Sequence, residues 1–158
     1  MDSEHEKFML EAIRMAREGL ENNLGGPFGA IIVKDGIIVG AGNNRVTSTN
    51  DPTAHAEMVA IRDACQRLNT FQLTDCVLYT SCEPCPMCLG AIYWARPKAV
   101  YYGCTKADAT AIGFDDSFIY AELEVDLAQR KIEMIQLGRA AALEVFKAWE
   151  LKPDRTDY

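Results

Sequence analysis

Residues 84–94 read PCPMCLGAIYW, and this stretch indicates where a helix begins and which reactive side chains lie at its start. Proline is favoured in the first turn of a helix and keeps the residue before it extended, so Pro84 and Pro86 predict a helix start. Cys85 and Cys88 are three positions apart, which places both sulfurs on one side of the first turn. Free backbone N–H groups there favour the thiolate forms. The stretch therefore predicts two sulfur ligands at a helix start.

Residues 55–57 read HAE and add an imidazole and a carboxylate to the sulfur pair. A structural zinc site normally has four protein ligands, whereas a catalytic site keeps one position for water. His55, Cys85 and Cys88 therefore predict a catalytic Zn²⁺ site, with one ion per subunit. A Cys-x-x-Cys pair also occurs in redox proteins, but a disulfide exchanger would not explain His55 and Glu57. We expect zinc.

Cys82 leaves open a different kind of site, in which three cysteines and one histidine close the zinc tetrahedron. That site would belong to a zinc-stabilised scaffold without turnover. The three sulfurs could align only if the helix began before Pro84, and proline keeps Glu83 extended. We therefore expect Cys82 to lie outside the metal site.

Glu57 is the predicted catalytic acid and base. Two thiolates balance the charge of Zn²⁺, so this ion should acidify water less than an all-imidazole site does, and a base is needed. Side chains two apart on a regular helix point in nearly opposite directions, but at a helix end Glu57 can still reach the water beside His55. We expect Glu57 to take a proton from water and return protons to a ring nitrogen and the leaving amine, which departs as ammonia.

Hydrophobic periodicity and turn residues predict alternating helices and strands. Helices are expected over about 3–21, 51–68, 84–94 and 139–151, with Asp51 as an N-cap before Pro52. Strands are expected over 28–33, 37–40, 76–79, 99–102 and 131–137, with Asp35-Gly36 as a tight hairpin turn. This order predicts the α/β fold class, as a three-layer α/β/α sandwich with a mixed central sheet.

Size and composition narrow the classes of protein. A chain of 158 residues fits one domain, which we expect over residues 1–151, followed by a polar tail over 152–158. The net charge of −7 disfavours nucleic-acid binding, and no stretch approaches the ~20 apolar residues of a membrane span. The polar start of the chain lacks secretory features, and six cysteines suit a reducing compartment, so we expect a cytoplasmic protein.

Several further motifs accompany the metal ligands. They are GGPFGA at 25–30, NN at 43–44, DPTAHAE at 51–57, SCEPCPMCLGAIYWA at 81–95 and GFDD at 113–116. With H-x-E followed by P-C-x-x-C, a signature of zinc nucleobase deaminases, the chain resembles the cytidine deaminase-like superfamily. Its details look most like the bacterial guanine deaminases of that fold. The segment AIGFDD at 111–116 is the more selective feature, since tRNA adenosine deaminases typically carry a basic, glycine-rich continuation there.

The resemblance implies a pocket for a purine base. In that pocket Asn44 would hydrogen-bond the base, Phe28 would stack on it, Ala56 would contact it and Trp94 would help form the wall. Each has an ordinary alternative, with Phe28 and Trp94 as core aromatics and Asn44 as a turn residue.

The resemblance also implies a second carboxylate and a second subunit. Asp116 would face the guanine edge and assist proton transfer to the departing ammonia, with Asp115 as its competitor and a helix cap as the alternative role. The family suggests a homodimer in which residues 152–158 cross to the partner, so that Tyr158 would contact the neighbouring substrate. A frayed terminus is the alternative for this tail.

The leading hypothesis is zinc-dependent hydrolytic deamination of guanine to xanthine and ammonia. A close competitor is a deaminase of another base or nucleoside, such as cytosine, cytidine, adenine or tRNA adenosine. The competitor from a different class is the non-catalytic zinc scaffold, for which Glu57 would be expendable.

Overall fold

The computed structural model describes residues 3–158. These residues form two compact units, one that ends at Asp116 and one over Ser117–Tyr158. The first unit contains all the strands that the described residues form. The expectation of one domain over 1–151 with a tail from 152 stays a prediction.

A β-hairpin begins the sheet, as predicted. Strand β1 (Gly29–Lys34) pairs antiparallel with β2 (Ile37–Asn43). Asp35 and Gly36 have φ angles of 50° and 75°, the left-handed backbone that a two-residue primed turn requires. Glycine adopts this conformation without strain, and aspartate tolerates it better than most residues. The dipeptide therefore sets the register of the hairpin.

The sheet is mixed, in the order β2-β1-β3-β4. Strand β3 (Cys76–Cys82) runs antiparallel to β1, and β4 (Ala99–Cys104) runs parallel to β3. Parallel neighbours need a crossover connection, which helix α4 (Pro86–Ala95) provides. The predicted mixed sheet is confirmed, with β3 and β4 longer than expected.

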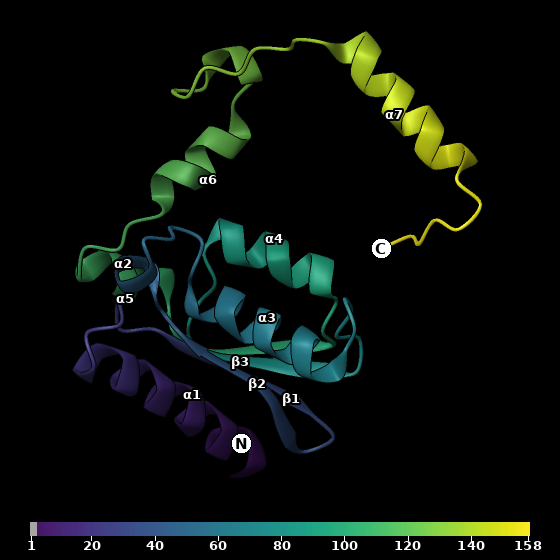
Figure 1. Ribbon diagram of the computed structural model, residues 1–158. Helices are drawn as coiled ribbons and strands as arrows, with labels where there is room; N and C mark the ends of the chain where they lie inside the picture. Colours follow the sequence, from purple (N-terminus) through teal and green to yellow (C-terminus); the bar gives the residue numbers. More distant parts are fainter. Residues whose placement is uncertain (1–2) are drawn as a thin grey trace. The chain divides into compact units, whose positions relative to one another are not determined.

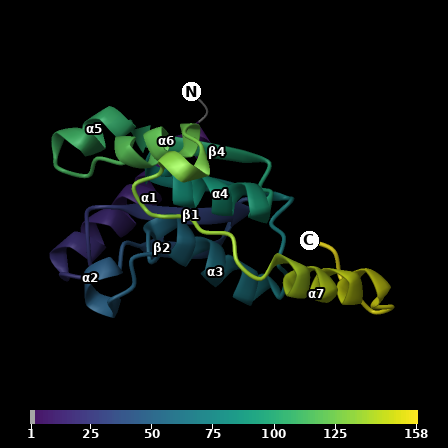
Figure 2. The ribbon, with the colours of Figure 1, turned by 90° about the horizontal axis from the view of Figure 1, so that it is seen from above.

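Helices cover both faces of the sheet, as Figures 1 and 2 show. Side chains alternate along a strand, so Ile31 and Val33 of β1 face α1 (Ser3–Glu21), where they pack with Phe8. Ala30 and Ile32 face the opposite side, toward α3 (Ala56–Leu68) and α4. The predicted three-layer α/β/α sandwich is confirmed.

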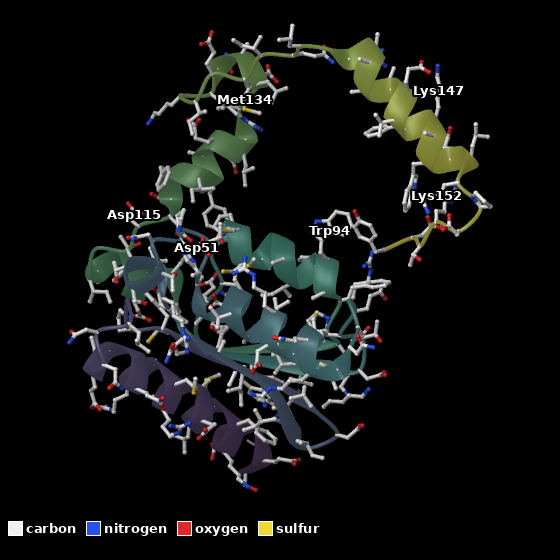
Figure 3. The ribbon with its side chains drawn as sticks, in the orientation of Figure 1. Asp51, Trp94, Asp115, Met134, Lys147 and Lys152 are labelled. Carbon is white, nitrogen blue, oxygen red and sulfur yellow. The ribbon has the colours of Figure 1, made fainter. Side chains whose placement is uncertain are left out.

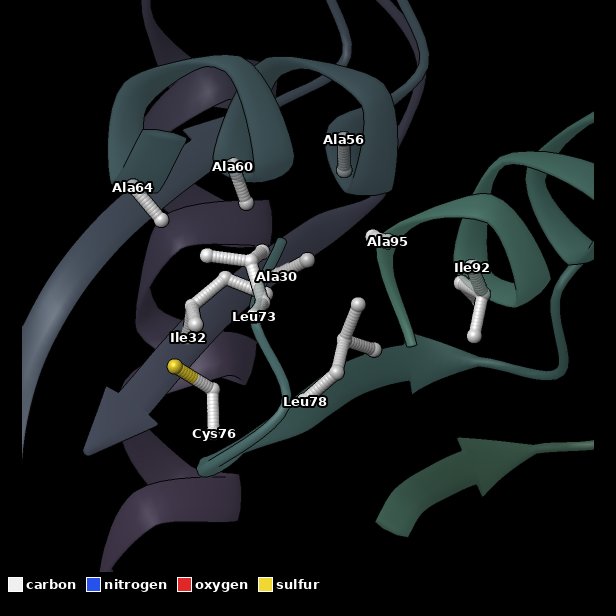
Figure 4. Close-up of a cluster of buried hydrophobic side chains, with 10 residues drawn as sticks. All are labelled: Ala30, Ile32, Ala56, Ala60, Ala64, Leu73, Cys76, Leu78, Ile92 and Ala95. Carbon is white, nitrogen blue, oxygen red and sulfur yellow. The ribbon is translucent and has the colours of Figure 1, made fainter. Parts of the chain in front are cut away.

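The larger core cluster lies between the sheet and helices α3 and α4 (Figure 4). Ala56, Ala60 and Ala64 recur every four residues on α3 and are fully buried. Their small side chains line the face of α3 that packs on the sheet. This packing fixes the start of α3 beside the strand ends.

Helix α3 begins at Ala56, so the prediction of a start at Asp51 was wrong. The Asp51 carboxylate does accept a hydrogen bond two residues later, from the Thr53 backbone N–H at 2.8 Å, and it also accepts one from the Thr53 hydroxyl. This is an Asx turn, which imitates a helix cap without starting a helix. His55 is the actual N-cap residue.

The predicted strand over 131–137 is also wrong, because these residues form no strand. Ile132 is 78% exposed and Leu137 is 92% exposed. An alternating apolar segment becomes a strand only when a neighbour accepts its backbone hydrogen bonds and covers one face, and no strand of the described residues pairs with this one.

The remaining elements are short, except for the predicted last helix. They are α2 (Val46–Thr49), α5 (Lys106–Ala111), α6 (Ser117–Glu124), η1 (Leu127–Gln129) and α7 (Arg139–Leu151). Among residues 3–158, no helix combines the length and the apolar character needed to span a membrane.

Candidate active site

Two helix starts position the predicted metal ligands. His55 is the N-cap of α3 and Cys85 is the N-cap of α4, and both have extended backbone, with φ near −70°. Cys88 lies in the first turn of α4 and is fully buried. Because His55 precedes the first helical residue, the two-residue spacing to Glu57 does not place their side chains on opposite sides. This local geometry lets both side chains share one site.

The ligand atoms fit a single metal ion. His55 Nδ1 lies 3.5 Å from Cys85 Sγ and 3.6 Å from Cys88 Sγ, and all three ligand atoms lie within 4.8 Å of one another. Tetrahedral zinc with Zn–N and Zn–S bonds of about 2.1 and 2.3 Å would hold nitrogen and sulfur about 3.6 Å apart. The predicted cluster is therefore present and has dimensions suited to Zn²⁺.

The two thiols influence each other strongly. The hydrogen bond with Cys88 lowers the pKa of Cys85 to about 4, and His55 also stabilises this thiolate. The same contact with Cys85 raises the pKa of Cys88, and burial acts in the same direction. The hydrogen bond with Cys85 raises the pKa of His55. A divalent cation would replace the protons that these groups share, as metal binding to thiols does in general.

Cys82 lies outside this cluster, as predicted. It is the last residue of β3, before the helix of Cys85 and Cys88 begins, and its sulfur contacts the backbone oxygen of Thr105 at 3.8 Å. Burial raises the pKa of the Cys82 thiol to about 11. A closed site that includes Cys82 is not supported by this geometry.

Glu57 is buried beside the ligands, with 5% of its surface exposed. Its Oε1 accepts a hydrogen bond of 2.7 Å from the Thr80 hydroxyl. Its charge contributes to raising the pKa of His55 and Cys88, which places the carboxylate next to the metal ligands. Glu57 is not part of the cluster of His55, Cys85 and Cys88, and a buried carboxylate beside the ligands is the arrangement that the prediction of an acid–base residue requires.

The Asn44 side chain is held in place by backbone groups that hydrogen-bond to its amide oxygen. Its Oδ1 accepts hydrogen bonds from the backbone N–H groups of Gly26 and Val46, at 3.2 and 3.1 Å. A Cβ at Gly25 would lie 2.3 Å from this oxygen, so only glycine fits there. No partner within residues 3–158 accepts from Nδ2, which leaves the N–H₂ group as a donor for a ligand.

Phe28 packs edge-to-face against Phe114, with ring centroids 4.9 Å apart and an interplanar angle of 87°. The backbone oxygen of Phe28 also accepts from the Asn44 N–H at 3.0 Å, so the aromatic pair adjoins the fixed amide. Phe114 was not predicted as a site residue, although it lies in the selective segment 111–116. Thr80 was not predicted either, and no local signal marks it, because its contact with Glu57 joins residues 23 positions apart.

Asp116 is half-buried, whereas Asp115 is exposed. Burial raises the pKa of the Asp116 carboxyl, and the charge of Cys85 acts in the same direction. Asp116 therefore lies within electrostatic range of a metal ligand. This difference favours Asp116 over Asp115 as the second carboxylate.

The three other residues expected to contact the substrate differ in burial and position. Ala56 is fully buried, and its N–H, in the first turn of α3, has no hydrogen-bond partner among the described residues. Trp94 is 62% exposed on the side of α4 facing away from the sheet (Figure 3), about 13 Å along the helix from Cys85 at 1.5 Å per residue. The role of Trp94 in the wall of the substrate pocket stays a prediction. Tyr158 is exposed in the second unit.

Comparisons with known proteins agree with this site. Residues 2–104 match the family described as the cytidine and deoxycytidylate deaminase zinc-binding region. Guanine deaminase of Bacillus subtilis (strain 168) is 54% identical over 98% of this chain and 99% of its own length. A crystal structure of guanine deaminase from Bacillus subtilis covers 98% of both chains, with a TM-score of 0.95 and 55% identity.

A tRNA-specific adenosine deaminase of Aquifex aeolicus (strain VF5) is 46% identical, but over 61% of this chain and 64% of its own length. The likeness to guanine deaminase thus extends through the second unit, beyond the zinc-binding region. On the metal-ligand geometry and these similarities, the chain belongs to the zinc-binding deaminase family that includes the guanine deaminase of Bacillus subtilis.

Proposed function

We propose that this enzyme hydrolyses guanine to xanthine and ammonia. The observation that carries the proposal is a buried Glu57 beside a three-ligand metal site, in a chain similar to a guanine deaminase over 98% of its length. A closed structural zinc site would need a fourth protein ligand, and Cys82 does not supply one. These facts favour catalysis over a scaffold role.

The chemistry divides between the metal and the protein. His55, Cys85 and Cys88 would hold Zn²⁺, which when bound acts as a Lewis acid and lowers the pKa of water. Glu57 removes a proton from the attacking water and then delivers protons to a ring nitrogen and to the amine that leaves as ammonia. Its burial excludes bulk water, which strengthens each of these hydrogen bonds.

Substrate recognition would use groups that the chain holds ready around the ligands. Asn44 Nδ2 and the Ala56 N–H are donors for acceptor atoms of the purine, and Phe28 offers an aromatic surface. Guanine also presents an N–H and an amino group on one edge, and the Asp116 carboxylate is a suitable acceptor for such donors. The combination fits guanine better than a base without that donor edge.

A substrate panel tests this function. Zinc-quantified protein is incubated with guanine, guanosine, adenine, cytosine, cytidine and an adenosine-bearing tRNA loop, and ammonia release is measured. We expect turnover of guanine well above that of the other compounds. Preference for another substrate would keep the zinc chemistry but reject the purine pocket, and no release from any compound would favour the scaffold.

Asp116→Ala is expected to lower kcat for guanine by about 10²-fold, the usual size of a positioned proton-transfer group. Zinc content and melting temperature should stay unchanged, because the carboxylate is only half-buried and is not a ligand. Steady-state kinetics measure the effect, and Asp115→Ala is the matched control. Normal kinetics for Asp116→Ala would reject its proton role.

We also propose a cytoplasmic homodimer. In the second unit none of the described residues is buried, and it exposes large apolar side chains including Phe118, Ile132, Phe146 and Leu151. A segment this small is not stable without a hydrophobic core, so a second copy of the chain is suited to bury its exposed apolar side chains. All six cysteines are free, which suits a reducing compartment.

Deleting residues 152–158 should raise KM for guanine about 10-fold or more, if Tyr158 stacks on the substrate of the partner subunit. Base–aromatic stacking typically contributes ~1–3 kcal/mol, and ~1.4 kcal/mol corresponds to a factor of ten. Tyr158→Ala should reproduce the effect, whereas Tyr158→Phe keeps the ring and should not. Full activity of the shortened chain would leave the tail as a frayed terminus.

A further inference from the structure

Thr80 is a fully buried polar residue whose hydroxyl lies between two acceptors. Its Oγ1 is 2.7 Å from Glu57 Oε1 and 3.0 Å from the backbone oxygen of Cys82. Residues two apart on a strand share a face, so Thr80 lies on the same side of β3 as Leu78, which packs under α3 and α4. The hydroxyl therefore points at the start of α3, where Glu57 lies.

The two side chains differ in how freely they can turn. Glutamate has three side-chain torsions, so burial alone does not select one orientation of its carboxylate. Threonine is branched at Cβ and has a restricted χ1, and its strand is paired on both sides by β1 and β4. A rigid donor on β3 thus fixes one oxygen of a flexible acid on α3.

We propose that Thr80 is a positioning residue of the deamination reaction, whose hydroxyl holds Glu57 in its productive orientation. The proposal rests on the proposed function of Glu57 as the proton carrier. Thr80 acts through Glu57 and contacts neither the metal ligands nor the substrate in this account. Its removal should therefore affect the chemical step and leave substrate binding nearly unchanged.

Thr80→Val and Thr80→Ser test this role by removing or keeping the hydroxyl. For Thr80→Val we expect kcat for guanine to fall about 10²-fold, since a misplacement of roughly 1 Å can cost that much, with KM within about 3-fold and zinc content unchanged. Thr80→Ser should recover kcat to within about 5-fold. Ile32→Val is the matched control, because it perturbs the same face of the sheet without touching Glu57.

A merely structural role predicts a different pattern. Thr80→Val, Thr80→Ser and Ile32→Val would then all lower the melting temperature by a few degrees, with kcat unaffected by the presence of the hydroxyl. Wild-type kcat in Thr80→Val would overturn the proposal. So would a failure of Thr80→Ser to recover more activity than Thr80→Val.

Crystal structures of the zinc-loaded variants test the positioning role of Thr80 without depending on which substrate the enzyme uses. If the wild-type protein releases no ammonia from guanine, the proposed function fails, but the orientation of Glu57 can still be compared. We expect the Glu57 carboxylate to turn away or become disordered in Thr80→Val and to keep its place in Thr80→Ser. An unmoved Glu57 in Thr80→Val would overturn the positioning role.

Discussion

Glu57→Gln is expected to lower kcat for guanine by at least ~10²-fold and up to ~10⁴-fold, while zinc content and fold are retained. Glutamine has nearly the same shape and can still accept a hydrogen bond from Thr80, so the buried contact at 2.7 Å survives. What it cannot do is take a proton from water. A 10²-fold loss corresponds to about 2.7 kcal/mol of transition-state stabilisation.

The measurement is steady-state ammonia release, with zinc quantified in the same sample and the fold checked by circular dichroism. Glu21→Gln is the control, because Glu21 lies exposed at the end of α1, where its carboxylate is 3.9 Å from the Arg17 guanidinium. Its kinetics should match those of the wild-type chain. Unchanged turnover in Glu57→Gln would remove the proposed mechanism and revive the zinc scaffold.

Cys88→Ser is expected to abolish measurable turnover by releasing the metal. Changes to residues that only orient a zinc ligand typically weaken metal affinity 10–100-fold, so loss of a ligand itself should exceed ~10²-fold. The melting temperature should fall as well, because a metal that binds the folded state stabilises it by mass action. Zinc analysis after dialysis, activity and thermal unfolding measure the three effects.

Cys82→Ala is the matched control for this experiment. Its sulfur is turned to the Thr105 oxygen, so removing it should leave about one zinc per chain and near-normal turnover. Loss of zinc from Cys82→Ala would contradict the three-ligand site and support a closed one. Retention of zinc and activity by Cys88→Ser would reject Cys88 as a ligand.

The metal site was predictable because its signal is local. Two cysteines three apart beside Pro84 and Pro86 can hardly point to different sides of a helix start, and His55, two positions before Glu57, completes the set. The structure confirms that His55, Cys85 and Cys88 converge. The hairpin at Asp35-Gly36 was predictable for the same kind of reason, since few dipeptides tolerate two positive φ angles.

Local sequence patterns gave a wrong secondary structure where the same pattern is compatible with two structures. Asp51 accepts a hydrogen bond from the residue two positions on in both a helix cap and an Asx turn, and nothing within residues 51–55 distinguishes them. Residues 131–137 alternate between apolar and polar residues as a strand does, but no strand of the described residues pairs with them. Whether a segment has a strand partner depends on the rest of the chain and cannot be read from the segment itself.

The sequence by itself predicted the three metal ligands, proposed Glu57 as the acid–base residue and indicated most of the helices and strands, because these depend on residue type and short spacing. Only the tertiary structure decided that Thr80 meets Glu57, that Cys82 turns to Thr105, and that Asn44 presents one side of its amide. Each of these contacts joins segments distant in the chain. Their geometry follows from how closely the helices pack on the sheet, which no local pattern contains.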